Sequence, residues 1–425
     1  MTNWWHKKLK AGSVLGTLII AMVILITCSV LLLALYYFKF FSIRDAIDQR
    51  LSDDLASAIS LVLANDQALG DPVHSAGILF ENNDADSVYY TEAQWGCFRA
   101  AGIKVAYKKR YKEKAFLYGA TRYSYADASI YLADHDRPLS VTGNTYIEGK
   151  AYLPKSGIRS GFFQQKGFTR ERLVEGSIDS SKKQLPALEP AFRAQLQQLA
   201  ALVAGDGSAA GAGFSTARQS FLQDPKKMKL PRNARLINDT AMGNLILLSD
   251  SAIEVSATTH LEDVILIAPF IHFTSGFKGT VQAIALDSIT IESGCRFEYP
   301  SALVGIGRSN TIGNTGTAIT MASGTTLHGL VLGLAEKSNT NIKPVIKIQA
   351  GATVKGLVYN EGFTYLNGKV EGAVFTDFFF EQRGPMSMEN ILIDATVSPS
   401  KWYRQAGYFS IFTEATAPTL LKWLY

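Results

Sequence analysis

The sequence predicts a mainly β protein: an N-terminal transmembrane and amphipathic α-helix, a small β-rich region, and then a three-sided parallel β-helix (solenoid). The first observation behind this is a long apolar run near the N-terminus, followed by an apolar residue at every fourth position. The second is a set of strand-like triplets spaced eighteen residues apart: Ile253-Glu254-Val255, Ile271-His272-Phe273 and Ile289-Thr290-Ile291. Apolar or glycine residues also fall at every sixth position: Val255, Leu261, Ile267, Phe273, Gly279, Ala285, Ile291, Phe297 and Leu303. Such self-similarity is typical of stacked coils that bury an inward face only against their neighbours.

Length and charge limit the possible functions only weakly. The chain has 425 residues, of which 47% are hydrophobic, so it is long enough for a large core. A repeat array can absorb roughly 200 residues without a second domain. The net charge of +5 is small for this length, so it gives no support for a nucleic-acid partner.

The segment 11–38 has the character of a transmembrane helix. It contains no charged residue, and about twenty apolar residues suffice to span a bilayer. Tyr36, Tyr37 and Phe38 end it as an interfacial belt would, whereas a cleaved signal peptide has a shorter apolar core and a small-residue cleavage site. Residues 1–10 carry Lys7, Lys8 and Lys10 without an acid, and the far flank is mixed in charge. This pattern predicts a bacterial inner-membrane protein with a cytoplasmic N-terminus and a periplasmic bulk.

An amphipathic extension is expected over residues 39–66. Its apolar stripe recurs every four residues and comprises Ile43, Ile47, Leu51, Leu55, Ile59 and Leu63. If this extension continues the span, one helix runs from about Ala11 to Asn65 and is on the order of 80 Å long. The stripe needs a partner, and we expect it to pack on strands of the same chain rather than on other subunits.

These first 65 residues resemble type IV pilin-like and minor pseudopilin proteins. The likeness lies in the basic start, the long uncharged helix, the amphipathic extension and the β-rich region after it. It implies a place in an envelope assembly or secretion machine. The family's processing site is a small residue followed by a hydrophobic run with glutamate at the fifth position. Here Gly12 or Ala11 is the small residue, but the fifth position after Gly12 is Thr17. Cleavage near Gly12 therefore stays open.

Residues 67–137 form the β-rich region, with short runs of β-forming residues between turns. Within it, the run 104–112 interleaves lysines and Arg110 with Tyr107 and Tyr111. Such a pattern can serve an anionic surface or a nucleic acid. A solvated hairpin with a lysine-rich edge that discourages aggregation explains it equally well, and we favour that interpretation.

Glycine-cornered strands define the expected solenoid. The pattern of an apolar residue, one further residue, a glycine and then alternation occurs in residues 139–153 and returns in 324–331, 351–358 and 368–374. The predicted division is a first β-helix coil at 138–156, a helical and flexible insertion at 157–231, the β-helix at 232–385 and a C-terminal cap at 386–425. The insertion holds a short helix at 188–202 and a Gly/Ala/Ser-rich stretch at 205–213. The run 374–380 and the tail 402–425 are unusually aromatic, and we expect the tail to cap the end of the solenoid, with an aromatic ligand-binding strip as the alternative.

The coils resemble two known classes of β-helix. Their glycine corners are similar to those of bactofilin-like polymer-forming proteins, which stack end to end and have no enzymatic role. Their six-residue beat is similar to that of left-handed hexapeptide-repeat acyltransferases, so handedness stays open. The block 276–283, with Cys295 and Tyr299-Pro300-Ser301, resembles a group of Bacteroidetes envelope proteins in which one span precedes such a region.

No arrangement of reactive residues predicts an enzyme. His260, His272 and His328 are candidates for an acyltransferase base, but His272 lies between Ile271 and Phe273 and should face solvent. The acids Glu262, Asp263, Asp287 and Glu292 fall at different phases of the coil. Cys97 and Cys295 have no metal-ligand spacing, although they can pair in an oxidising compartment. We therefore assign no catalytic, cofactor-binding or metal-binding residue.

The sequence thus predicts a membrane-anchored structural or assembly component of the cell envelope. Its partners would be the lipid bilayer, other envelope or pilin-like proteins and further copies of itself. The alternative is a carbohydrate-binding, carbohydrate-active or acyl-transferring β-helix.

Overall fold

The computed structural model describes residues 11–64, 75–81, 87–163, 165–204, 215–307, 317–335, 343–383, 386–400 and 402–424. Strands make up 53% of the structure and helices 20%, which confirms the mainly β class. The basic tail 1–10 and the Gly/Ala/Ser-rich stretch 205–213 lie outside the described residues.

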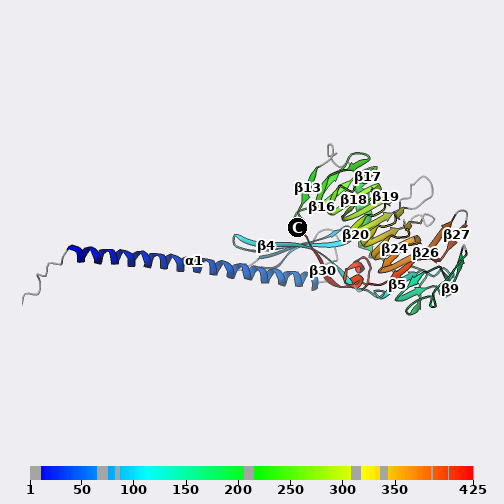
Figure 1. Ribbon diagram of the computed structural model, residues 1–425, viewed down its shortest axis with the longest axis horizontal. Helices are drawn as coiled ribbons and strands as arrows, with labels where there is room; N and C mark the ends of the chain where they lie inside the picture. The colour runs from blue at the N-terminus through cyan, green and yellow to red at the C-terminus, as the bar shows by residue number, and fades with distance from the viewer. Residues whose placement is uncertain are drawn as a thin grey trace, which may run out of the picture.

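The N-terminal helix is continuous, as expected. Helix α1 spans Ala11–Ala64 without interruption and projects away from the β-rich body (Figure 1). Among the described helices it is the one long and apolar enough to cross a membrane, and none of its most apolar window is buried. By length and composition, α1 can therefore serve as a membrane span.

The second half of α1 packs on an antiparallel sheet of the same chain. Leu51, Leu55, Ala58 and Val62 are buried against a cluster that includes Val88, Ile103, Val105 and Phe116. The sheet has the order β1 (Ser75–Glu81), β2 (Ser87–Trp95), β3 (Phe98–Tyr107), β4 (Arg110–Arg122) and β30 (Thr416–Leu424). The expectation that the stripe packs on its own chain is confirmed, except that its first member, Ile43, is 52% exposed.

A barrel-like parallel sheet contains most of the other strands. Its early members are β5 (Ala128–Leu132), β7 (Tyr146–Ile147), β8 (Lys150–Leu153), β12 (Ile178–Ser180), β13 (Thr216–Gln219), β14 (Lys226–Lys229), β15 (Ala234–Leu236), β16 (Thr240–Leu248) and β17 (Ala252–Val255). Its later members are β18 (His260–Phe273), β19 (Lys278–Ile291), β20 (Arg296–Ile306), β21 (Ala318–Met321), β22 (Thr326–Leu334), β23 (Val345–Ile348), β24 (Thr353–Leu366), β25 (Lys369–Glu371), β26 (Ala373–Arg383) and β29 (Thr396–Ser398).

The remaining strands make smaller pairings. Strand β27 (Met386–Glu389) pairs antiparallel with β26, while β28 (Ile391–Ile393), β6 (Leu139–Thr142) and β9 (Ile158–Ser160) form a separate parallel sheet. Strands β10 (Phe162–Phe163) and β11 (Lys166–Gly167) make a small hairpin.

The parallel pairings fall into three columns. The repeated triplets stack in the first column, where Ile253 pairs with Ile271 and Ile271 with Ile289. The same column continues through Ile319 and Ile346. The second column holds the first residues of β18, β19 and β20. The third column holds the middle parts of β18, β19 and β24 and the last parts of β16, β20 and β22. The eighteen-residue interval is therefore a real pairing register.

Alternation within each strand separates two cores. Residues such as Ile271, Phe273 and Phe297 point into the space enclosed by the columns. On the third column the opposite side chains are buried as well, including Ile265, Ile284 and Val304, because another layer covers them. The six-residue beat fails at one place, since Ile267 lies in this outer core and Ala268 in the inner one. The pairing register of β18 shifts on both sides of this stretch, between Glu262 and Val264 and again between Ala268 and Phe270.

The cover over the third column comes from distant segments. Helix α2 (Pro190–Ala201) buries Phe192, Leu196 and Ala200 there, and η2 (Leu202–Ala204) extends it. The short helices η3 (Trp402–Gln405) and η4 (Tyr408–Ile411) bury Tyr403 and Phe409 in the same core. The C-terminal segment 386–425, expected as an end cap, instead adds β28 and β29, covers this flank and completes the antiparallel sheet with β30.

The order of strands in space differs from their order in the chain. We expected residues 138–156 to be the coil preceding those of 232–385, but β5 pairs with β26 and β7 pairs with β29. Strands β13 and β14 pair with β16 at the opposite end of the stack (Figure 1). The segment 157–231, expected as an insertion at a coil edge, therefore contributes strands at both ends, with α2 lying along the flank between them.

One glycine corner is dictated by close approach of the backbone. Gly356 adopts φ +155°, and a Cβ at this position would lie 1.8 Å from the carbonyl oxygen of Gly329 in the neighbouring strand. Only a residue without a side chain fits between strands stacked so closely.

Candidate functional site

Four half-buried aromatic rings form a ladder on the outer face of the first column. Phe363 and Tyr365 come from β24, and Phe378 and Phe380 come from β26. Parallel pairing sets Phe363 opposite Phe378, with ring centroids 5.4 Å apart. Phe380 follows at 5.1 Å from Phe363 and 5.2 Å from Tyr365. Strand alternation makes this possible, because the intervening Thr364 and Phe379 are buried.

His135 and Lys343 cover one end of this aromatic ladder. The imidazole of His135 stacks on Phe378 with centroids 4.2 Å apart and planes 11° apart. The Lys343 ammonium lies 4.2 Å from the centroid of the same ring. Asp377 contacts both side chains, with 2.6 Å between its Oδ1 and His135 Nε2 and an ion pair to Lys343. The cluster therefore fixes the position of the Phe378 ring.

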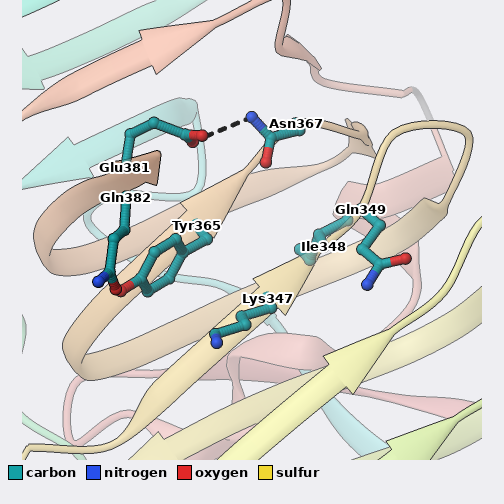
Figure 2. Close-up of a pocket in the computed structure, with 7 residues that line it drawn as sticks. All are labelled: Lys347, Ile348, Gln349, Tyr365, Asn367, Glu381 and Gln382. Atoms are coloured by element: carbon teal, nitrogen blue, oxygen red, sulfur yellow. Dashed lines mark hydrogen bonds between the residues drawn. The ribbon is translucent and has the colours of Figure 1, made fainter. Parts of the chain in front are cut away.

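A shallow, open pocket lies at the other end, beside Tyr365 (Figure 2). Its volume is about 380 Å³, and it is lined by Lys347, Ile348, Gln349, Tyr365, Asn367, Glu381 and Gln382. Asn367 Nδ2 donates a hydrogen bond of 3.1 Å to Glu381 Oε2, and this pair forms one wall. The Lys347 ammonium lies 5.1 Å from the centre of the Tyr365 ring.

The pocket combines an aromatic ring with three amide side chains and with one charged side chain of each sign, Lys347 and Glu381. Burial raises the pKa of Tyr365, and the nearby Glu381 carboxylate raises it further. The phenol therefore stays protonated at neutral pH and can donate a hydrogen bond. The amides of Gln349, Asn367 and Gln382 each carry both donors and acceptors. A ring with amides around it suits a ligand that has apolar faces and many hydroxyl groups.

The histidine candidates do not come together. His260 and His272 lie on different columns, and each is near a glutamate of its own, Glu262 at 3.7 Å and Glu292 at 3.1 Å. The expectation that His272 faces outward is confirmed, since Ile271 and Phe273 beside it are buried. His328 pairs in register with Lys355, and burial, together with the Lys355 charge, lowers its pKa.

The acids serve local contacts. Glu292 accepts hydrogen bonds from the hydroxyl and backbone N–H of Ser275, each 2.8 Å long, and these bonds lower its pKa, as does the nearby His272. Asp263 is buried and pairs with Lys422. Within the described part of the chain, no three His, Cys, Asp or Glu side chains are grouped as metal ligands would be.

The two cysteines that we considered as a disulfide are both free. Cys295 lies in the inner core, whereas Cys97 lies in the outer core under the antiparallel sheet. The pairing hypothesis is therefore wrong in this structure, because the wall of parallel strands separates the two side chains.

Sequence reasoning missed the cluster of His135, Lys343 and Asp377. These residues are up to 242 positions apart, and β5 reaches β26 only through the unexpected strand order. The alternating rings of Phe363 and Tyr365, and of Phe378 and Phe380, were visible in the sequence as a signal of two outward-facing strands.

No protein-family model matches the chain, and neither a curated protein nor a solved structure matches it.

Proposed function

We propose that this chain is a membrane-anchored structural or assembly component of a bacterial cell envelope, of the kind found in pilin-like or secretion machines. The observation that carries the proposal is the division of α1. Its apolar half is exposed along its whole length, whereas Leu51, Leu55 and Val62 pack on the antiparallel sheet. A helix divided in this way fixes a folded head directly to a membrane span, which agrees with the resemblance to type IV pilin-like proteins.

The body presented by this anchor is, in this proposal, a three-sided β-helix. Its support is the set of three pairing columns and the eighteen-residue register of Ile253, Ile271 and Ile289. A rigid stack of this kind suits a scaffold, because each coil is held by hydrogen bonds to both neighbours.

The proposed orientation places the N-terminus in the cytoplasm and the body in the periplasm. Its support is the uncompensated Lys7, Lys8 and Lys10 before the span. Labelling with a membrane-impermeant maleimide tests it in a chain that carries Cys28→Ser, since Cys97 and Cys295 are buried. Lys227→Cys, on an exposed strand, should be labelled in spheroplasts, and Lys8→Cys only after lysis. Labelling of Lys8→Cys alone in intact spheroplasts would reverse the topology. Recovery of the chain in the soluble fraction after alkaline carbonate extraction would refute the anchor.

A second candidate function, carbohydrate binding, is favoured by the pocket beside Tyr365. The Tyr365 ring lies in one open pocket with the amides of Gln349, Asn367 and Gln382, and this combination fits the alternating apolar and hydroxyl surfaces of a sugar. Full-length protein in detergent, screened against envelope polysaccharides and their fragments, should bind at least one of them. Tyr365→Ala should abolish that binding, whereas Tyr89→Ala, at an exposed ring on β2, should not. Equal binding by both variants would show that the pocket beside Tyr365 is not the binding site. Turnover that is lost in His260→Ala or His272→Ala would instead indicate an enzyme.

A further inference from the structure

The hairpin of β3 and β4 ends beside the turns of α1 that follow the apolar segment in the chain. Arg110 Nη1 donates to Asp48 Oδ1 at 3.1 Å and to the carbonyl oxygen of Arg44 at 3.3 Å. Farther from the tip, Lys112 Nζ donates to Ser52 Oγ at 2.6 Å and to the carbonyl oxygen of Asp48 at 2.8 Å. Figure 1 shows this hairpin lying along α1 and pointing toward its N-terminal half.

These contacts fix the height of the hairpin tip above the bilayer. Phe40 and Phe41 follow the aromatic belt of Tyr36, Tyr37 and Phe38, and at 1.5 Å per residue Asp48 lies about 10 Å beyond Phe41 along the helix. Lys108 and Lys109 form the turn beyond Arg110 and therefore lie closer to the apolar segment of α1 than Asp48 does. The headgroup layer on each side of the hydrocarbon core is roughly 5–8 Å thick. The tip thus lies at the level of the headgroups when α1 spans the membrane.

The charges at the tip divide into two sets. Arg110 and Lys112 hold the hairpin against α1. Lys108 and Lys109 are exposed, and within the described residues neither has a carboxylate partner. Lys39 and Arg44, exposed on the helix at the same level, add to the positive charge, whereas Asp45 is the exposed acid among them. The result is a local excess of cations facing the membrane.

Aromatic residues beside these cations are placed as at a membrane interface. Tyr111 is 58% exposed, and Lys104 lies 4.6 Å from its ring centre. Tyr107 packs against α1 and has the Arg50 guanidinium 5.8 Å from its ring centre, so it is not a free stacking platform for a base. Tyrosine with lysine is typical of the headgroup region. This arrangement favours a lipid surface over a nucleic acid.

We propose that Lys108 and Lys109 bind the phosphate headgroups of anionic phospholipids in the bilayer that holds α1, and so fix the tilt of the head relative to the membrane. This inference rests on the proposed membrane anchoring. It gives the basic and aromatic run 104–112 a function beyond that of a solvated edge.

The test uses the full-length chain reconstituted in phosphatidylcholine vesicles with trace spin-labelled lipid. The relative association of labelled phosphatidylglycerol over labelled phosphatidylcholine is measured for the wild-type chain and for Lys108→Gln/Lys109→Gln. The matched control is Lys226→Gln/Lys227→Gln, an adjacent exposed pair on β14 at the far edge of the parallel sheet. Since each lysine near an anionic surface contributes roughly a fivefold change in binding, the tip variant should lose phosphatidylglycerol selectivity by at least about threefold, and the control should not. The phosphatidylglycerol selectivity of the wild-type chain should also decrease in 0.5 M salt, which is well above the physiological ionic strength of roughly 0.15 M.

Flotation separates failure of this inference from failure of the anchor. If the wild-type chain does not float with the vesicles, the membrane anchor is refuted and the inference with it. If all variants float and the tip variant keeps its selectivity, the inference alone is overturned. A tip variant that keeps its lipid selectivity but loses binding of a short DNA duplex, when the control does not, would likewise overturn it in favour of a nucleic acid.

Discussion

Gln282 is one of the side chains that join the antiparallel sheet to the parallel strands. It is fully buried in β19, where its Oε1 accepts a 2.6 Å hydrogen bond from the Cys97 N–H and its Nε2 donates at 3.1 Å to the Trp95 carbonyl. Gln282→Leu would leave both backbone groups buried and unpaired, at about 1–3 kcal/mol each. We expect a loss of about 2–4 kcal/mol in the free energy of unfolding.

Chemical denaturation of the detergent-solubilised chain measures this loss. Gln382→Leu is the matched control, because Gln382 is exposed and its replacement should change stability by less than about 0.5 kcal/mol. Equal midpoints for the two variants would show that the Gln282 hydrogen bonds are not needed to hold the sheets together.

Asp263 and Lys422 form an ion pair between β18 and the C-terminal strand. Lys422 Nζ lies 2.8 and 2.7 Å from the two carboxylate oxygens, and only 4% of Asp263 is exposed. Burial raises the pKa of Asp263 above its ordinary 3.8, and the Lys422 charge opposes this only in part. The pKa of Asp263 is thus higher in the folded protein than in the unfolded chain. As pH rises from the unfolded pKa to the folded pKa, the unfolded chain releases its proton first, so the stability that Asp263 contributes decreases.

Lys422→Met makes this pH dependence measurable. It leaves the Asp263 carboxylate buried without its cation, so stability at pH 7 should fall by about 3 kcal/mol. Most of the loss should return near pH 4, because Asp263 then becomes neutral in the folded protein. Urea denaturation at both pH values tests this, with Asp263→Asn/Lys422→Met as the control, which should show little difference between them. An equal loss at pH 4 and pH 7 for the single variant would contradict the argument.

At the scale of elements, the joint between α1 and the antiparallel sheet carries the predicted anchor. Leu55 is 6% exposed in the helix–sheet core, whereas Leu61, less than two turns later, is 46% exposed. Leu55→Ala should therefore cost about 2–4 kcal/mol, and Leu61→Ala less than about 0.5 kcal/mol. Thermal unfolding followed by tryptophan fluorescence measures both. If the two substitutions have the same effect, the second half of α1 does not pack as described.

In the whole molecule, the C-terminal strand β30 connects the antiparallel sheet with the parallel strands and the outer core. β30 pairs with β4 along Ala115–Arg122, Lys422 contacts Asp263 and Leu424 enters the outer core. A chain that ends after Ala415 should lose amide protection in β4 by on the order of tenfold or more, because its edge becomes solvent-exposed. Hydrogen exchange followed by mass spectrometry measures this, with β24 as the internal reference. Trp423→Ala, at a 42% exposed side chain, is the control that should keep protection. Unchanged exchange in β4 after truncation would contradict this account.

Local patterns predicted much of this molecule. The apolar run and the four-residue stripe predicted α1, since helix periodicity and membrane length depend only on neighbouring residues. The interval between Ile253, Ile271 and Ile289 predicted the pairing register, because each of these strands pairs with one that is near it in the sequence. The outward direction of His272 followed from strand alternation in the same way.

The candidate site was only partly visible in the sequence. The run 374–380 was recognised as aromatic, but the alternation of Phe363 with Tyr365 and of Phe378 with Phe380, which could have indicated two outward-facing strands, was not used. The partners of these rings were not visible, because His135 reaches Phe378 only where β5 pairs with β26. Likewise, the basic run 104–112 gave no sign that its turn would lie beside Arg44 and Asp48.

The sequence by itself determined the long apolar helix, the strand periodicity and the eighteen-residue pairing interval, since each depends on residues close together in the chain. Only the tertiary structure decided which distant segments pair. It placed β5 beside β26, β30 beside β4 and the β3–β4 turn beside Asp48 of α1. The physical reason is that parallel strand edges accept many partners with equal hydrogen bonding, so the choice among them depends on side chains far apart in sequence, such as Gln282 with Cys97 and Lys422 with Asp263.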